Sequence, residues 1–149
     1  MRERATPALE TMPWSRGERF VVTAGVLLAA DLALVPWHRF RLDRTLERFG
    51  IQVPSFRLDR TGLQDPYALL GVAAFVVVLA MVVHVLATRL HDALRPAAQA
   101  QLIGGAVVLG LVVAKMLAHN RFLGPGAWAG VVLAGGVAFG GYLISQHSP

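Results

Sequence analysis

The chain contains no cysteine, and only 15% of its 149 residues are charged. Without cysteine there are no disulfide bonds, no thiolate metal sites and no nucleophilic thiol chemistry. The sequence also lacks an HExxH zinc motif, a GxSxG nucleophile motif and a phosphate-binding glycine loop, because its glycines lie within apolar runs. We therefore predict no catalytic residue, no cofactor and no metal ion, and we expect a protein that is not an enzyme.

Long apolar runs dominate the composition. Hydrophobic residues make up 55% of the chain and the mean hydropathy is +0.55, well above the values of ordinary globular domains. A helix needs about 20 apolar residues to cross a hydrocarbon core of about 30 Å. The pattern predicts an all-α integral membrane four-helix bundle that forms one domain, residues 19–149, behind a disordered cytoplasmic tail, residues 1–18. The expected spans are residues 19–36, 66–88, 99–119 and 126–144.

The first apolar run has a rival interpretation as a cleaved signal peptide, since basic residues precede it and Ala29-Ala30 resembles a cleavage site. A site there would place Leu28 at the position where a small residue is required. This mismatch favours a retained span.

Residues 37–65 form the only sizeable loop, a 29-residue segment between the first and second spans. The sequence Phe-Arg-Leu-Asp-Arg-Thr occurs in it twice, at residues 40–45 and 56–61. Its alternation of apolar and basic residues is typical of a half-buried strand, so the copies can pair as a hairpin. An amphipathic segment lying on the membrane surface is the other interpretation. Either way, the candidate interfacial contacts are Trp37, His38, Arg41 and Arg57.

The excess of basic residues gives the chain a net charge of +5. The arginines lie at the ends of apolar runs, where phospholipid head groups are the nearest anions, so we predict contact with a lipid bilayer and not with nucleic acid. They divide almost evenly between the two sides of the expected bundle. The basic residues before the first span and the short basic turn 89–96 favour cytoplasmic termini in a multi-pass protein of a bacterial cytoplasmic membrane.

Two ionisable residues, Asp31 and Lys115, interrupt the first and third spans. A charged group at the centre of a spanning helix costs about 2.5–3.5 kcal/mol on insertion scales, so each invites a functional hypothesis. The two spans run in the same direction and both residues lie near their ends, which predicts an intramembrane ion pair. The alternative is that Lys115 reaches the head groups while Asp31 is wetted at the interface.

Glycines recur at the spacing that places two of them on one helix face. The candidate helix-packing residues are Gly104, Gly110, Gly126, Gly130, Gly136 and Gly140. We expect these faces to pack within the bundle; a dimer interface is the alternative.

Several short motifs stand near the ends of the spans: Leu34-Val-Pro-Trp-His-Arg39, then 61–67 with the sequence Thr-Gly-Leu-Gln-Asp-Pro-Tyr, then 122–130, which follows Lys115, and the closing Phe-Gly-Gly-Tyr at 139–142. With them the chain resembles the small four-span membrane proteins of unknown function that are common in actinobacteria. The resemblance implies a four-helix membrane protein whose Pro-Trp junction faces outside and whose termini lie inside. It brings no activity with it.

The sequence thus predicts a non-enzymatic structural or interaction component of the membrane, with a membrane-protein partner or a second copy of the chain as its binding partner. A subunit of a small oligomeric transporter or channel is the alternative, and it requires an oligomer because a bundle rich in small residues packs shut. An enzyme acting on lipid is a third class. It would need His38, His119 and loop arginines to converge near head-group depth.

Overall fold

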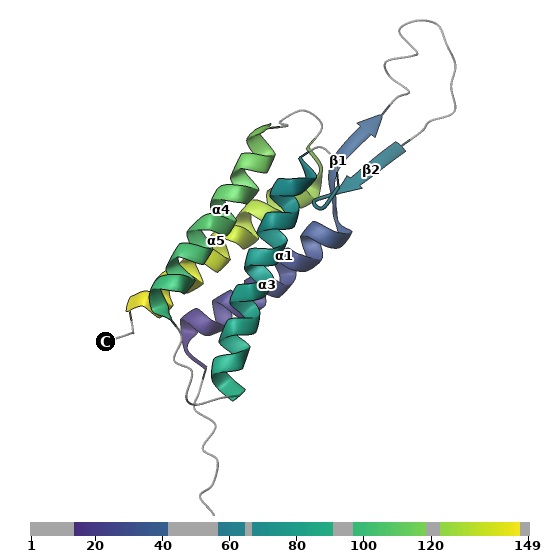
Figure 1. Cartoon of the computed structure of the whole chain (residues 1–149). Coiled ribbons are helices and arrows are strands. Elements are labelled where there is room, and N and C mark those ends of the chain that lie inside the picture. The colour runs from purple at the N-terminus through teal and green to yellow at the C-terminus, as the bar shows by residue number, and fades with distance from the viewer. Residues whose placement is uncertain (1–13, 42–56, 65–66, 91–96, 119–122, 147–149) are drawn as a thin grey trace, which may run out of the picture.

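The computed structural model describes residues 14–41, 57–64, 67–90, 97–118 and 123–146. Within them the chain forms four helices and two strands, and Figure 1 shows the helices packed side by side with the strands projecting from one end of the bundle. The elements are α1 (Arg16–Leu34), β1 (Pro36–Arg41), β2 (Arg57–Thr61), α3 (Ala68–Leu90), α4 (Ala98–Ala118) and α5 (Pro125–Gln146). The predicted four-helix bundle is confirmed, and a small two-stranded sheet is added to it.

Of the described helices, α3, α4 and α5 are long and apolar enough to cross a membrane, with mean hydropathies of 2.8, 2.0 and 1.7. Their outer faces expose large apolar side chains, among them Leu69, Val83, Ile103 and Val132. Such surfaces belong in lipid. Three candidate spans indicate a multi-pass membrane protein in contact with a bilayer.

Helix α1 differs from the other three because Glu18, Arg19 and Asp31 interrupt it. It is not among the three candidate spans, so its predicted membrane crossing stays a prediction. The helix begins at Arg16, earlier than expected, and the tail predicted to be disordered lies largely outside the described residues.

The helices alternate in direction. Helix α1 packs against both α3 and α5, and α4 packs against the same two helices. The core they share consists mainly of fully buried aliphatic side chains, including Val21, Leu28, Leu32, Val78, Val85, Val108 and Val137. The start of α1 and the end of α5 therefore lie at one end of the bundle, where Gly17 contacts Gly140 and Ile144, and the strands lie at the other end (Figure 1).

The start of α1 is fixed by a capping box. The Ser15 hydroxyl accepts a hydrogen bond from the Glu18 backbone N–H at 3.2 Å, and the Glu18 carboxylate accepts one from the Ser15 N–H at 2.8 Å. Glu18 also forms a salt bridge with Arg89 in the last turn of α3, and the Arg89 guanidinium lies 5.5 Å from the centre of the Trp14 ring. These contacts tie the first turn of the bundle to the end of α3.

The strands pair antiparallel, with Arg39 opposite Asp59 and Phe40 opposite Leu58, and the register is irregular between Pro36 and His38. The hairpin interpretation of the loop is confirmed for these residues. The second copy of the repeat supplies β2, whereas only the first two residues of the first copy, Phe40 and Arg41, lie in β1. The rest of the first copy lies outside the described residues.

Candidate functional site

Three of the buried polar residues in the described part of the chain, Asp31, His38 and Lys115, lie where the hairpin joins the bundle. Trp37, the second residue of β1, is completely buried. Its indole ring lies on the face of α5 formed by Gly126 and Gly130: a Cβ at Gly126 would lie 2.8 Å from Trp37 Cδ1, and one at Gly130 would lie 2.9 Å from Trp37 Cη2. Real Cβ atoms essentially never approach this closely, so the two glycines make the space that the ring occupies. The Gly-x-x-x-Gly spacing here seats a side chain from the loop.

Asp31, in the last turn of α1, forms a hydrogen bond with this ring. The indole Nε1–H donates to Asp31 Oδ2 at 3.0 Å, and the Asp31 backbone carbonyl accepts the Val35 N–H at 3.0 Å as α1 ends. Only 4% of Asp31 is exposed. A buried carboxylate requires hydrogen-bond donors, and the indole supplies one that also fixes where β1 begins.

Lys115 is buried at the same end of the bundle, with 1% of its surface exposed. Its ammonium donates to the carbonyl oxygens of Tyr67, at 3.0 Å, and Gln64, at 3.4 Å. Both carbonyls belong to the turn that leads from β2 into α3. Tyr67 has a φ of +59°, a left-handed conformation that is uncommon for a non-glycine residue. The ammonium thus bonds to the strained residue just before α3 and helps to hold it in place.

Close backbone contacts complete the junction. A Cβ at Gly62 would lie 3.0 Å from Leu32 Cα, and one at Gly71 would overlap the Gly62 carbonyl and lie 3.5 Å from Lys115 Cε. The Gly124 N–H donates to the Trp37 carbonyl at 2.6 Å, and His38 forms an isolated bridge with Leu123. Segments from α1, both strands, α3, α4 and the start of α5 therefore meet around the base of the hairpin.

The predicted partners Asp31 and Lys115 lie at the same end of the bundle, as their similar depth implied. The hydrogen bonds described for them go elsewhere: Asp31 to Trp37, and Lys115 to backbone carbonyls. The ion pair between them stays a prediction.

The four residues that were expected at the membrane interface fall into two groups: two are buried, and the side chains of the other two are not described. Trp37 and His38 are both completely buried in the protein, because the indole finds its acceptor on Asp31 and β1 packs onto the start of α5. Arg41 and Arg57 face each other across the register of the hairpin; the positions of their side chains lie outside what is described.

Five of the six predicted packing glycines contact another element. Gly126 and Gly130 seat Trp37, a Cβ at Gly104 would meet the Met81 sulfur at 2.9 Å, and one at Gly140 would meet Val21 N at 2.8 Å. The fifth is Gly136, whose Cβ would lie 3.1 Å from that of Ala24. These contacts lie within the described part of the bundle, and the packing role of the glycines stays a prediction. Gly110 faces open space, so a packing role for it finds no contact here.

Glu18 and Arg89 were not among the predicted site residues. The spacing Ser15-x-x-Glu18 ahead of an apolar run is a recognisable capping box and could have identified the start of α1. The pairing of Glu18 with Arg89 joins residues that are far apart in the chain, and no local pattern indicates it.

Metal ligation finds no support in the described ranges, where no three His, Asp or Glu side chains form a group able to hold an ion. His119, needed for the lipid-enzyme hypothesis, lies outside them. Comparisons with family models, with curated proteins and with solved structures find no match.

Proposed function

We propose that this chain is a non-enzymatic component of a bacterial cytoplasmic membrane that presents the β1–β2 hairpin, at a fixed angle, to a membrane-protein partner or to a second copy of itself. The observation that carries the proposal is that two buried polar side chains, Asp31 and Lys115, form hydrogen bonds at the base of the hairpin. Asp31 accepts a hydrogen bond from the Trp37 indole, and the Lys115 ammonium donates to the carbonyls of the turn that follows β2. Both stabilise the attachment of the hairpin.

Burying charged side chains to hold the hairpin on the bundle costs free energy. This cost argues that the hairpin has a function. Two strands alone are marginally stable, and a buried lysine is expensive without hydrogen-bond acceptors. A connection between two helices needs only a few residues. A long, rigidly rooted projection fits a contact surface better than a simple link between α1 and α3.

The proposed arrangement places the hairpin outside the cell and both termini in the cytoplasm. The start of α1 and the end of α5 share one end of the bundle, which an even number of crossings requires. The basic residues before α1, the short basic turn 89–96 and the resemblance to four-span actinobacterial proteins favour this orientation.

Site-specific photo-cross-linking in native membranes tests the proposal. A photoreactive amino acid replaces the exposed Arg39 in β1, and in a matched control it replaces Val83, which is exposed on α3. We expect one defined species, a single protein or a dimer of the chain, to be captured from position 39 and not from position 83. Trp37→Ala in the same background should abolish that capture by releasing the root of β1. Equal capture from both positions would contradict the proposal.

A transporter or channel subunit is the second candidate, favoured by the burial of Lys115 within the bundle. It requires an oligomer. Lys115→Met should then alter ion or solute flux through liposomes containing the protein, whereas the hairpin proposal expects no flux in either form.

A further inference from the structure

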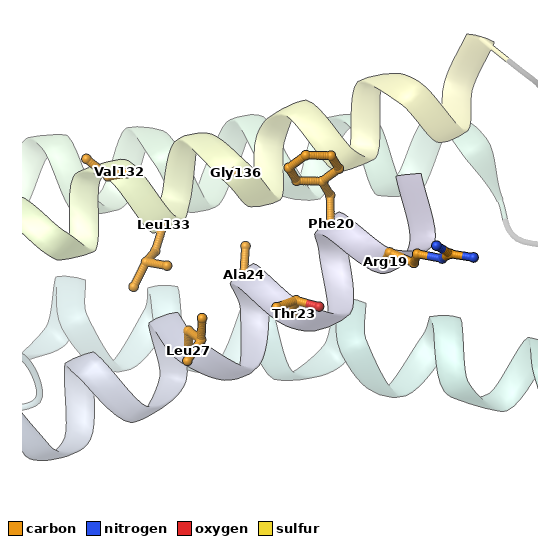
Figure 2. A pocket seen from close by; sticks show the side chains of 8 residues that line it. All are labelled: Arg19, Phe20, Thr23, Ala24, Leu27, Val132, Leu133 and Gly136. Atoms are coloured by element: carbon orange, nitrogen blue, oxygen red, sulfur yellow. The ribbon is translucent and has the colours of Figure 1, made fainter. Parts of the chain in front are cut away.

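A groove of about 400 Å³ runs along the bundle surface between α1 and α5. Figure 2 shows its walls: Leu133 of α5 points toward Ala24 and Leu27 of α1, and Phe20 of α1 points toward α5. Val132 and Gly136 of α5 complete the lining. The lining is almost wholly apolar. Its polar groups are the Arg19 guanidinium at one end and the Thr23 hydroxyl one turn further along α1.

The Arg19 end of the groove lies at the edge of the apolar part of the bundle. The preceding residue, Glu18, forms its salt bridge with Arg89 in the last turn of α3, so both arginines stand where that candidate span ends. Charged residues at the end of a membrane-crossing helix lie among the lipid head groups. Arg19 therefore lies at the depth of phosphates, and the groove descends from it into the hydrocarbon.

The walls of the groove are firmly placed. At the Arg19 end, the Phe20 ring meets Phe139 of α5 edge to face, with 5.4 Å between ring centres. In the floor, a Cβ at Gly136 would lie 3.1 Å from the Ala24 Cβ, so small residues bring the two helices together there. The groove is a built feature of the α1–α5 contact.

The size of the groove favours an extended hydrocarbon chain over a second helix as its occupant. From Arg19 to Leu27 the helix rises about 12 Å, most of the roughly 15 Å depth of one leaflet. A second helix about 10 Å across would occupy roughly 900 Å³ over that length, a larger volume than the groove encloses. An extended hydrocarbon chain is much thinner and fits the same length.

We propose that this groove binds one anionic phospholipid, with an acyl chain between α1 and α5 and the phosphate on Arg19. The guanidinium forms charge-assisted hydrogen bonds with phosphate oxygens. The Thr23 hydroxyl, one turn deeper, donates to an ester oxygen of the glycerol region. This site lies away from the hairpin and does not depend on the hairpin having a partner.

Native mass spectrometry of the full chain tests the head-group contact. The protein is mixed with phosphatidylglycerol or with phosphatidylcholine carrying the same acyl chains, and the retained lipid is counted. We expect about fivefold more phosphatidylglycerol to be retained, the effect of one arginine near an anionic head group. Arg19→Gln should abolish the preference. Arg16→Gln is the matched control, because Arg16 is exposed one turn earlier and does not line the groove, and it should keep the preference. Equal losses in the two variants would overturn the proposal by showing general surface attraction.

A photoreactive phosphatidylglycerol, with a diazirine in one acyl chain, tests the position of that chain. Adducts should map to Leu27 and Leu133, and Thr23→Phe, which fills the groove from an exposed position, should reduce them severalfold. Adducts spread evenly over the outer faces of α3 and α4 would overturn the site. So would a chain dimer cross-linked through a cysteine placed at Leu27, since a second copy would then occupy the groove.

Discussion

The indole of Trp37 and the carboxylate of Asp31, six residues apart, form a buried hydrogen bond of 3.0 Å across the junction between α1 and β1. The bond satisfies two groups that would each be costly to bury alone. It also determines the direction in which the chain leaves the helix, because the ring is held against α5 by Gly126 and Gly130.

A double-mutant cycle measures this relationship. Trp37→Phe leaves the Asp31 carboxylate without its donor, and Asp31→Leu leaves the indole N–H without its acceptor. Each change should lower the free energy of unfolding in detergent by about 1–3 kcal/mol. The double variant leaves neither group unpaired, so its loss should be clearly smaller than the sum of the two. Additive losses would show that the two side chains act independently.

Because the Trp37 ring packs directly on Gly130, even a methyl group at this position should destabilise the protein. Gly130→Ala places a methyl group where the ring lies and should lower the melting temperature in detergent. Gly110→Ala is the matched control, because Gly110 lies in α4 with open space beside it. That change should be neutral or should stabilise the helix by up to about 1 kcal/mol. Similar changes in melting temperature for the two variants would argue against close packing of the Trp37 ring on Gly130.

Lys115 is the only lysine in the chain, which allows a direct test of its burial. An amine-reactive reagent should leave Lys115 unmodified in the folded protein and modify it within minutes after the protein is unfolded. Mass spectrometry of the digested protein measures the modified fraction of Lys115. Equal rates of modification before and after unfolding would contradict the burial of the ammonium against the Gln64 and Tyr67 carbonyls.

The Glu18–Arg89 salt bridge predicts a pH dependence. Burial by itself raises the pKa of Glu18, but the hydrogen bonds from Arg89 and Ser15 outweigh it and hold the pKa below its usual value of 4.5. The unfolded chain then binds the proton more readily, so the stabilisation is fully present above about pH 4.5 and is lost as the pH falls through the lower pKa of the folded protein. The melting temperature should therefore fall more between pH 5 and 3 in the unmodified protein than in Glu18→Gln. If the melting temperatures of the two proteins fell equally with pH, the predicted role of the Glu18–Arg89 salt bridge would be wrong.

Local patterns in the sequence predicted the elements well. The second, third and fourth apolar runs, expected at 66–88, 99–119 and 126–144, correspond to α3, α4 and α5. The repeat at 40–45 and 56–61 led to the hairpin as one of two interpretations, and most of its first copy lies outside the described residues. Strand register depends on which residues find partners in the fold. Here the strand begins at Pro36, next to the buried Trp37.

The candidate site was predicted less completely, for a physical reason. Costly groups such as Asp31 and Lys115 stand out in an apolar sequence, so both were identified. Their hydrogen-bond partners were not, because an indole and two backbone carbonyls are common groups that no pattern distinguishes. The role of Gly126 and Gly130 was missed likewise, since the spacing indicates close approach but not what approaches.

The sequence by itself determined the class of this protein: runs of apolar residues long enough to cross a bilayer, with few charges between them, make a helical bundle because lipid leaves the backbone no other partner for its hydrogen bonds. Only the tertiary structure decided how the ends of those helices are joined. Trp37, Asp31 and Lys115 find their partners across separate segments, and the groove beside Arg19 exists only where α1 and α5 meet. Such contacts depend on which surfaces come together, and that is settled by packing of the whole chain.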